Sequence, residues 1–161
     1  MAEEPASPVS FGMLEHVLGF RMQRLRAALA ARMLVAMKRW SLPKGSFMVL
    51  ALVQANPGLG QTALVRETGI RKTLLVAVLH ALEARGLVMR RALTSDHRQK
   101  QVYITDAGQT VLTDMAEAVM AIEAPLRTGL SDDAMRQMKA AFDQALAAVH
   151  ADDGVRETGE A

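Results

Sequence analysis

The chain has 161 residues, half of them hydrophobic, with no cysteine and a formal net charge of +2. This length suits one domain with a sizeable core, and the hydrophobic content excludes an intrinsically disordered chain. The absence of cysteine excludes disulfides, thiol redox sensing and thiolate zinc sites. No apolar run reaches the length of a membrane span and no charged leader precedes an apolar signal core, so we expect a cytoplasmic protein.

Charge is distributed unevenly along the chain. The net charge is −3 over residues 1–20, +7 over residues 21–45, +4 over residues 46–110 and −6 over residues 111–161. A basic middle followed by an acidic end is typical of a protein that binds a polyanion. The same asymmetry also occurs on ordinary solvated surfaces, so charge alone does not decide between the two.

The N-terminal half predicts a tail followed by helices. Two prolines and no apolar pattern over residues 1–8 predict a disordered tail. Apolar residues at near-helical spacing predict a long helix from Val9 to Arg39, which Ser41-Leu42-Pro43 interrupts. Three further helices are predicted over residues 44–55, 61–68 and 72–85, the last two ending at Gly69 and Gly86.

A polar, charged hairpin tip follows between two apolar segments, Gly86–Met89 and Val102–Ile104. Helix, strand, basic hairpin and strand in this order are the layout of a winged helix-turn-helix. In that layout one element enters the major groove, and the hairpin reaches the backbone or the minor groove. We therefore assign residues 41–104 to a DNA-binding lobe.

Thr105 and Ser131 are predicted to cap two more helices, over residues 106–127 and 132–150. The acidic residues 151–161 are predicted to form a disordered tail. The fold class is thus mainly α, a winged helix-turn-helix with about six helices and a two-stranded β wing.

The end segments predict self-association. Long helices with apolar stripes flank the lobe, and little of the domain is left to cover them. A symmetric dimer through residues 9–40 and 105–150 is the simplest way to cover these stripes.

Basic residues gather at two places in the predicted lobe. Arg71, Lys72 and Thr73 cluster at the N-terminus of the 72–85 helix, where free backbone N–H groups favour a phosphate. In the wing, Asp96 is placed to hold the guanidinium of Arg98 in one orientation. A charged αα-hairpin with a solvated loop is the alternative to this interpretation. The DNA-binding candidates are Gln61, Thr62, Arg71, Lys72, Thr73, Arg90, Arg91, Asp96, His97, Arg98 and Lys100.

Residues 11–149 resemble the MarR (multiple-antibiotic-resistance regulator) family of winged-helix transcription factors. The matching motifs are Leu82-Glu83-Ala84-Arg85-Gly86-Leu87-Val88, Asp96-x-Arg98 and Ile104-Thr105-x-x-Gly108. The resemblance implies an obligate homodimer, a pseudo-palindromic operator in double-stranded DNA, usually repression, and often relief by a small aromatic or phenolic ligand. It also implies that Arg98 enters the minor groove, supported by Asp96, and that the 72–85 helix reads the major groove.

One stretch departs from the family pattern. The 72–85 helix carries an apolar run from Leu74 to Leu79, where family members usually carry polar residues. These side chains could contact thymine methyls, accompany indirect readout of DNA shape, or belong to the core. The sequence leaves this open, so base readout depends on Arg71, Lys72, Thr73 and the wing.

The resemblance further places a ligand between the dimer helices and the DNA-binding lobe. The candidates are Arg21, Arg24, Lys44, Met48 and Val119. The arginines could meet an anionic ligand or face solvent or DNA. Five methionines could form an adaptable pocket wall or belong to the core: Met22, Met33, Met37, Met48 and Met115.

No catalytic or metal-binding pattern accompanies these features. The sequence has no nucleophile motif, no paired carboxylates in a pocket context and no phosphate-binding glycine loop, and its four histidines are scattered. We expect neither an enzyme nor a bound metal or cofactor. The alternative function is a winged-helix module for protein–protein interaction with weak or no DNA binding.

Overall fold

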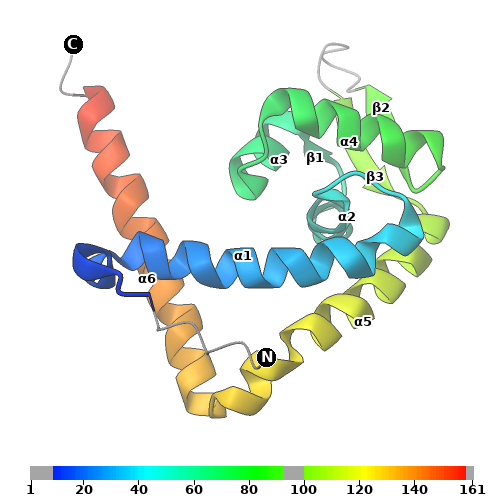
Figure 1. The fold of residues 1–161 in the computed structure, drawn as a ribbon. Coiled ribbons are helices and arrows are strands. Elements are labelled where there is room, and N and C mark those ends of the chain that lie inside the picture. The colour runs from blue at the N-terminus through cyan, green and yellow to red at the C-terminus, as the bar shows by residue number, and fades with distance from the viewer. Residues whose placement is uncertain (1–8, 93–99, 159–161) are drawn as a thin grey trace, which may run out of the picture. The chain divides into compact units, whose positions relative to one another are not determined.

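The computed structural model describes residues 9–92 and 100–158, with side chains as far as Ala151 (Figure 1). The chain divides after Val119, within one helix, into two compact units. The first unit contains a 3-10 turn (Gly12–His16), α1 (Leu18–Met37), a 3-10 turn (Lys38–Trp40), α2 (Ser46–Ala55), β1 (Leu59–Gly60), α3 (Gln61–Thr68), α4 (Lys72–Ala84), β2 (Val88–Ala92), β3 (Lys100–Ile104) and the start of α5 (Asp106–Gly129). The second unit contains the end of α5 and α6 (Asp132–Thr158).

Six α-helices and a small antiparallel sheet in the described residues confirm the predicted winged-helix architecture. β2 and β3 pair along all five residues of each strand, as expected for a wing. The structure adds a third strand, because the two residues of β1 pair with Val102 and Gln101 of β3. The sheet order is therefore β1-β3-β2.

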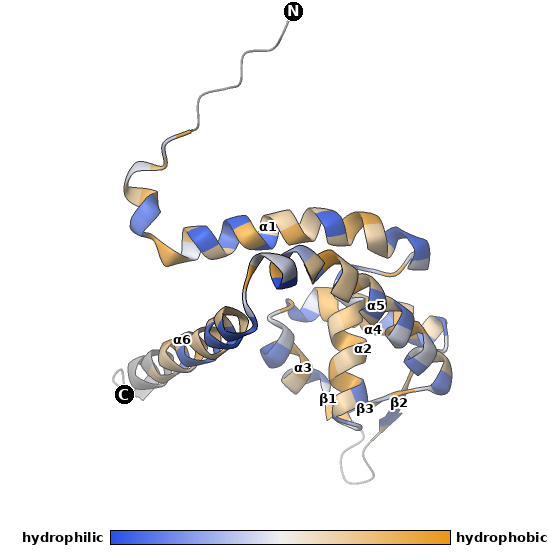
Figure 2. Cartoon of the chain, turned by 90° about the horizontal axis from the view of Figure 1, so that it is seen from below, coloured by the Kyte–Doolittle hydropathy of each residue, from blue (hydrophilic) through white to orange (hydrophobic). Residues whose placement is uncertain are grey.

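The core of the first unit lies between α2, α4 and the sheet. α2 is hydrophobic almost throughout (Figure 2), and its Val49, Leu50 and Val53 are fully buried. α3 contributes Leu64 and β3 contributes Val102. Burial of these branched side chains against one another is the main stabilisation of the unit.

The apolar run of α4 is divided between core and surface. Leu75, Val78 and Leu79 are buried, together with Leu82 one turn later, which is the spacing of one helical face. Leu74 is 44% exposed at the edge of this face, one turn before Val78. Half of the run is therefore core, and the exposed part of α4 carries both polar and apolar side chains.

The turn between α3 and α4 needs a glycine. Gly69 has φ +63, a left-handed conformation that other residues adopt at a cost. Its N–H donates to the carbonyl of Val65, and the Oγ1 of Thr68 accepts from the N–H of Ile70. These bonds satisfy backbone groups at the end of α3 and in the turn that follows it.

Thr105 and Gly108 join α5 to the end of α4. The Oγ1 of Thr105 accepts from the N–H of Gly108 at 3.0 Å and donates to the carbonyl of Gly86 at 2.6 Å. A Cβ on Gly108 would lie 2.0 Å from the carbonyl oxygen of Leu87, so no side chain fits there. The predicted cap at Thr105 is confirmed, and the glycine three residues later allows the close approach.

The predicted helix over residues 9–39 is interrupted at Val17, whose backbone is extended. The guanidinium of Arg21 donates two hydrogen bonds to the carbonyl of Glu15, and that of Arg24 lies 4.4 Å from the centre of the Phe11 ring. These side-chain contacts link the short turn before Val17 to the start of α1. A continuous helix over this segment is therefore wrong.

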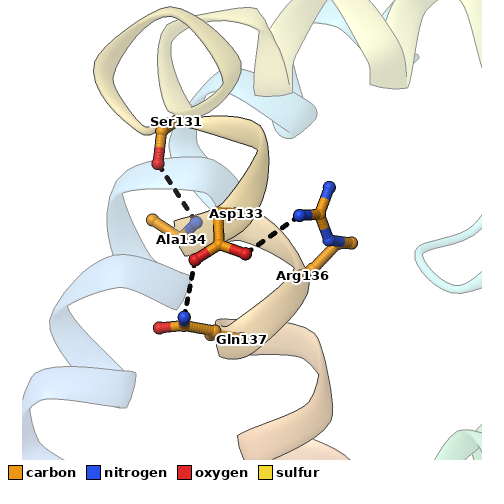
Figure 3. Close-up of polar contacts among 5 residues, drawn as sticks. All are labelled: Ser131, Asp133, Ala134, Arg136 and Gln137. Atoms are coloured by element: carbon orange, nitrogen blue, oxygen red, sulfur yellow. Dashed lines mark hydrogen bonds and ion pairs between the residues drawn. The ribbon is translucent and has the colours of Figure 1, made fainter.

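α6 begins as predicted and ends later. The N–H of Ala134 donates to the Oγ of Ser131 at 3.2 Å, and Asp133 accepts from Arg136 and Gln137 one turn on (Figure 3). The helix continues to Thr158 instead of ending near His150. Gly154 lies within it, since a glycine weakens a helix by about 1 kcal/mol without being an obligatory stop.

None of the helices in the described parts of the chain is long and apolar enough to cross a membrane.

Candidate nucleic-acid interface and ligand pocket

A groove of about 870 Å³ lies on the lobe, bounded by the start of α3, the outer face of α4 and the base of the wing. Its lining residues are Gly58, Gly60, Gln61, Thr62, Ala63, Val65, Lys72, Leu75, Val76, His80, Arg90, Lys100 and Gln101. Three of the predicted basic residues, Lys72, Arg90 and Lys100, line it from separate elements. The groove is therefore a concave surface with positive charge on two of its sides.

The N-terminus of α4 opens on this groove through Lys72. Arg71, Lys72 and Thr73 are exposed, and no acidic residue occurs in the first turn of the helix. The free N–H groups of that turn and the helix dipole favour a phosphate oxygen. Gln61 and Thr62 lie at the start of α3 and also line the groove.

The base of the wing carries two of the predicted DNA-binding residues. Arg91 and Lys100 are exposed, and the Arg91 guanidinium lies 5.1 Å from the centre of the Tyr103 ring. Asp96, His97 and Arg98 lie outside the described residues.

Arg90 points from β2 to α4 and pairs with Glu83. Its side chain is only 11% exposed, and its Nε lies 2.9 Å from the Oε2 of Glu83. This hydrogen bond is the main reason that the pKa of Glu83 is lowered; burial opposes the shift, and the charges of Arg90, His80 and Lys100 add to it. The predicted DNA candidate Arg90 is thus held within the lobe by a partner that sequence spacing did not indicate.

His80 is a groove residue that the sequence reasoning missed. It is exposed on α4, two turns after Lys72 and one turn after Val76, which also line the groove. Helical periodicity could have found it, because the buried positions Leu75, Val78 and Leu79 leave His80 on the outer face.

A second, more apolar cavity of about 670 Å³ lies between α1, the turn after it, α2 and α5. Its lining residues are Ala30, Ala31, Met33, Leu34, Met37, Lys38, Ser41, Leu42, Pro43, Lys44, Gly45, Ser46, Phe47, Met48 and Met115. Lys38 and Lys44 add positive charge to an otherwise aliphatic and aromatic wall. A pocket of this size and character suits a small organic ligand with an anionic group.

The structure brings together only two of the five predicted ligand residues. Lys44 and Met48 line the cavity. Arg21 and Arg24 are engaged near the start of α1, with the Glu15 carbonyl and the Phe11 ring. Val119 is buried in α5 and is not part of the lining.

The lining residues Lys38 and Phe47 were not predicted. The helix break at Ser41-Leu42-Pro43 was the available signal, since the turn that it creates forms one side of the cavity. In the parts of the chain that the structure describes, no three histidine or carboxylate side chains gather as a metal site would require.

These features define a winged-helix DNA-binding fold. The sequence model of the MarR family matches residues 40–99. The transcriptional repressor CouR, solved bound to a 23-mer DNA duplex, is 30% identical with a TM-score of 0.70, covering 89% of this chain and 99% of that one. The chain belongs to the MarR family of DNA-binding transcriptional regulators.

Other relatives extend the comparison. A MarR-family regulator from Silicibacter pomeroyi shares the fold with a TM-score of 0.78 at 23% identity, covering 88% of this chain and 97% of that one. CouR from Rhodococcus jostii RHA1, solved bound to p-coumaroyl-CoA, is 27% identical with a TM-score of 0.71, covering 82% and 93%.

A Thauera aromatica protein, named as a transcriptional regulatory protein for the hcr operon, is 31% identical over 88 residues. That match takes in 55% of this chain and spans 53% of the Thauera protein, about half its length.

Proposed function

We propose that the chain acts as a cytoplasmic homodimer that represses transcription from a pseudo-palindromic operator and leaves the DNA when a small aromatic ligand binds. The groove at α4 carries the proposal. It combines a helix N-terminus free of acidic residues with Lys72 and Lys100 from two elements. A phosphate backbone that crosses this groove meets positive charge on both sides, while the outer face of α4 faces the base edges.

Exposed apolar helix faces, on α6 and on α1, support self-association. On α6, Phe142, Leu146 and Val149 are 38%, 57% and 58% exposed and recur at the spacing of one helical face. On α1, Leu34 and Val35 are also more than 60% exposed. Apolar helix faces of this kind are normally covered, and a two-fold partner offers the same faces in return.

The apolar cavity supports the ligand. Phe47, Met37 and Met48 offer an adaptable surface for an aromatic ring, and Lys38 and Lys44 offer charge to an anionic group. CouR binds p-coumaroyl-CoA, which joins an aromatic acyl group to a polyanionic carrier. We therefore propose an aromatic acid as ligand class, with its coenzyme A thioester as the form that uses both features.

The competing function is a protein–protein interaction module. The exposed Leu74 is the observation that favours it, because an exposed apolar side chain on α4 suits contact with a protein partner. Such a module would bind DNA with a salt dependence near zero and no sequence preference.

Selection of bound sequences from random DNA tests the function directly. We expect a palindrome whose half-sites lie about one helical turn apart. Arg98→Ala should weaken binding to the selected sequence about tenfold or more, as expected for loss of a groove contact. Arg136→Ala is the control, since Arg136 is an exposed arginine of α6. Enrichment of no sequence, or equal binding by the Arg98 and Arg136 variants, would favour the interaction module.

Release by ligand tests the regulation. We expect p-coumaroyl-CoA to displace the protein from its selected DNA at lower concentration than free p-coumarate, and Lys44→Gln to weaken this response. Lys139→Gln on α6 is the matched control. Linkage requires that saturating DNA weaken ligand binding by the same factor. Equal ligand affinity with and without DNA would show that the cavity does not regulate DNA binding.

A further inference from the structure

We propose that His80 reads a base edge in the major groove and helps to set the operator sequence. The inference rests on the proposed function, because it requires the groove at α4 to hold DNA. It adds a specificity-determining residue beyond the basic cluster at the start of the helix.

The outer face of α4 forms a stripe along the groove. Lys72, Val76 and His80 follow one another at intervals of four residues and line the same groove. Residues at this interval lie above one another on a helix. The stripe therefore runs from the helix N-terminus towards the base of the wing.

Chemistry singles out the third member of the stripe. The structure describes the whole of α4. After its first three residues, the α4 residues that line the groove are Leu75, Val76 and His80. Leu75 is 1% exposed and Val76 has only methyl groups to offer, whereas an imidazole has two ring nitrogens for directed hydrogen bonds. A donor of this kind can bond to N7 or O6 of guanine or to N7 of adenine, which the major groove displays.

The other groove-lining residues near His80 are less well placed to read a base. Arg90, which lines the same part of the groove, is already paired with Glu83. Lys100 lies on β3, on the wing side of the groove. Gln101 also lies on β3, and its Oε1 accepts a hydrogen bond from the Tyr103 hydroxyl. Among the residues of α4, base discrimination at this end of the groove therefore falls to His80.

The spacing predicts which base pair is involved. Eight residues of helix span about 12 Å, which equals three to four base pairs at about 3.4 Å each along the DNA axis. If α4 lies along the groove, His80 reads a position three to four base pairs from the one nearest Lys72, in each half-site.

The test compares the sequences selected by the full-length wild type, His80→Ala and His80→Gln. His150→Ala is the control, because His150 is an exposed histidine of α6. We expect the His80 variants to lose preference at one position of each half-site, symmetrically placed, and to discriminate there about tenfold less. Preference at the other positions and the midpoint of thermal unfolding should be unchanged.

Other outcomes would overturn the inference. An equal loss of affinity for all sequences, with a shallower salt dependence, would make His80 a phosphate contact. An unchanged selected sequence would show that His80 reads nothing while leaving the proposed function intact. A wild type that selects no sequence would overturn the proposed function together with this inference.

Discussion

Glu83 connects the helix that faces the groove to the wing through one ion pair. Its partner Arg90 has a side chain only 11% exposed, so Glu83 compensates a charge that would otherwise be largely buried without a partner. Glu83 itself is 38% exposed and screened by water. The pair therefore acts more on the position of β2 than on overall stability.

Replacing this carboxylate should weaken both stability and DNA binding. Because the folded-state pKa of Glu83 is lowered, the pair stabilises the fold above the ordinary glutamate pKa, and this contribution is lost as pH falls through the lower folded value. We expect Glu83→Gln to cost about 1 kcal/mol or less at pH 7, as for partly exposed pairs. Urea unfolding measured at pH 7 and below about pH 4.3 should show that the difference in free energy of unfolding between wild type and variant becomes smaller at acid pH.

Glu117→Gln on α5 controls for the loss of one negative charge. Glu117 is exposed and takes part in no ion pair among the described residues. A wild-type-minus-variant difference that is the same at both pH values would contradict the role of the pair. DNA binding at pH 7 should fall more for Glu83→Gln than for Glu117→Gln. Only the former substitution removes the ion pair with Arg90 that holds β2, at the base of the wing, against α4.

Among the elements, α6 carries an apolar face that is left exposed in the single chain. Its half-buried Met135 and Met138 continue the face of Phe142, Leu146 and Val149. This apolar stripe of α6 is about four turns long. An element of this kind is stable in water only when a partner covers it.

We predict that Phe142→Ser combined with Leu146→Ser lowers the apparent mass in sedimentation from a dimer towards the 17.5 kDa of one chain. Each substitution removes apolar area worth about 1.5–3 kcal/mol if it is buried between copies. Gln144→Ser with Ala147→Ser is the control, since these exposed residues lie on the other side of the helix. A dimer that persists in the stripe variant would place the interface elsewhere.

Local signals predicted most element boundaries. Gly69, Gly86, Thr105 and Ser131 end or begin helices where the sequence indicated, because capping depends on residues close in the chain. The strand β1 was not predicted, since its two residues are ordered only by pairing with β3, about forty residues later.

The candidate sites follow the same division. The cluster Arg71-Lys72-Thr73 was predicted because it is contiguous, and it lies exposed at the start of α4. The pairing of Arg90 with Glu83 and the cavity walls at Lys38 and Phe47 depend on contacts between elements. Charge pattern alone could not separate a DNA contact from a structural ion pair in Arg90.

At the scale of the whole molecule, the small net charge conceals an uneven distribution of charge along the chain. The net charge is only +2, yet residues 21–110 carry a large positive excess and residues 111–161 are acidic. A two-fold dimer presents two copies of the groove, so each half-site meets the same basic surface. Half-site centres about 34–36 Å apart, one turn of DNA, would suit such a dimer.

Salt dependence measures how much of this surface reaches phosphates. With Arg90 held by Glu83, the remaining basic candidates per subunit are Arg71, Lys72, Arg91, Arg98 and Lys100. If about three of them reach phosphates in each subunit, the dimer makes about six such contacts, and affinity should fall about a thousandfold between 50 and 200 mM salt.

Fluorescence anisotropy on the selected duplex across that salt range gives the slope. Lys72→Gln should lower the slope by about two for the dimer, since each copy loses one phosphate contact, whereas Lys139→Gln on α6 should leave it unchanged. A wild-type slope near zero would contradict a phosphate-dominated interface. An unchanged slope in Lys72→Gln would move the phosphate contacts from the start of α4 to the wing, because released counterions report only the charges that the DNA neutralises.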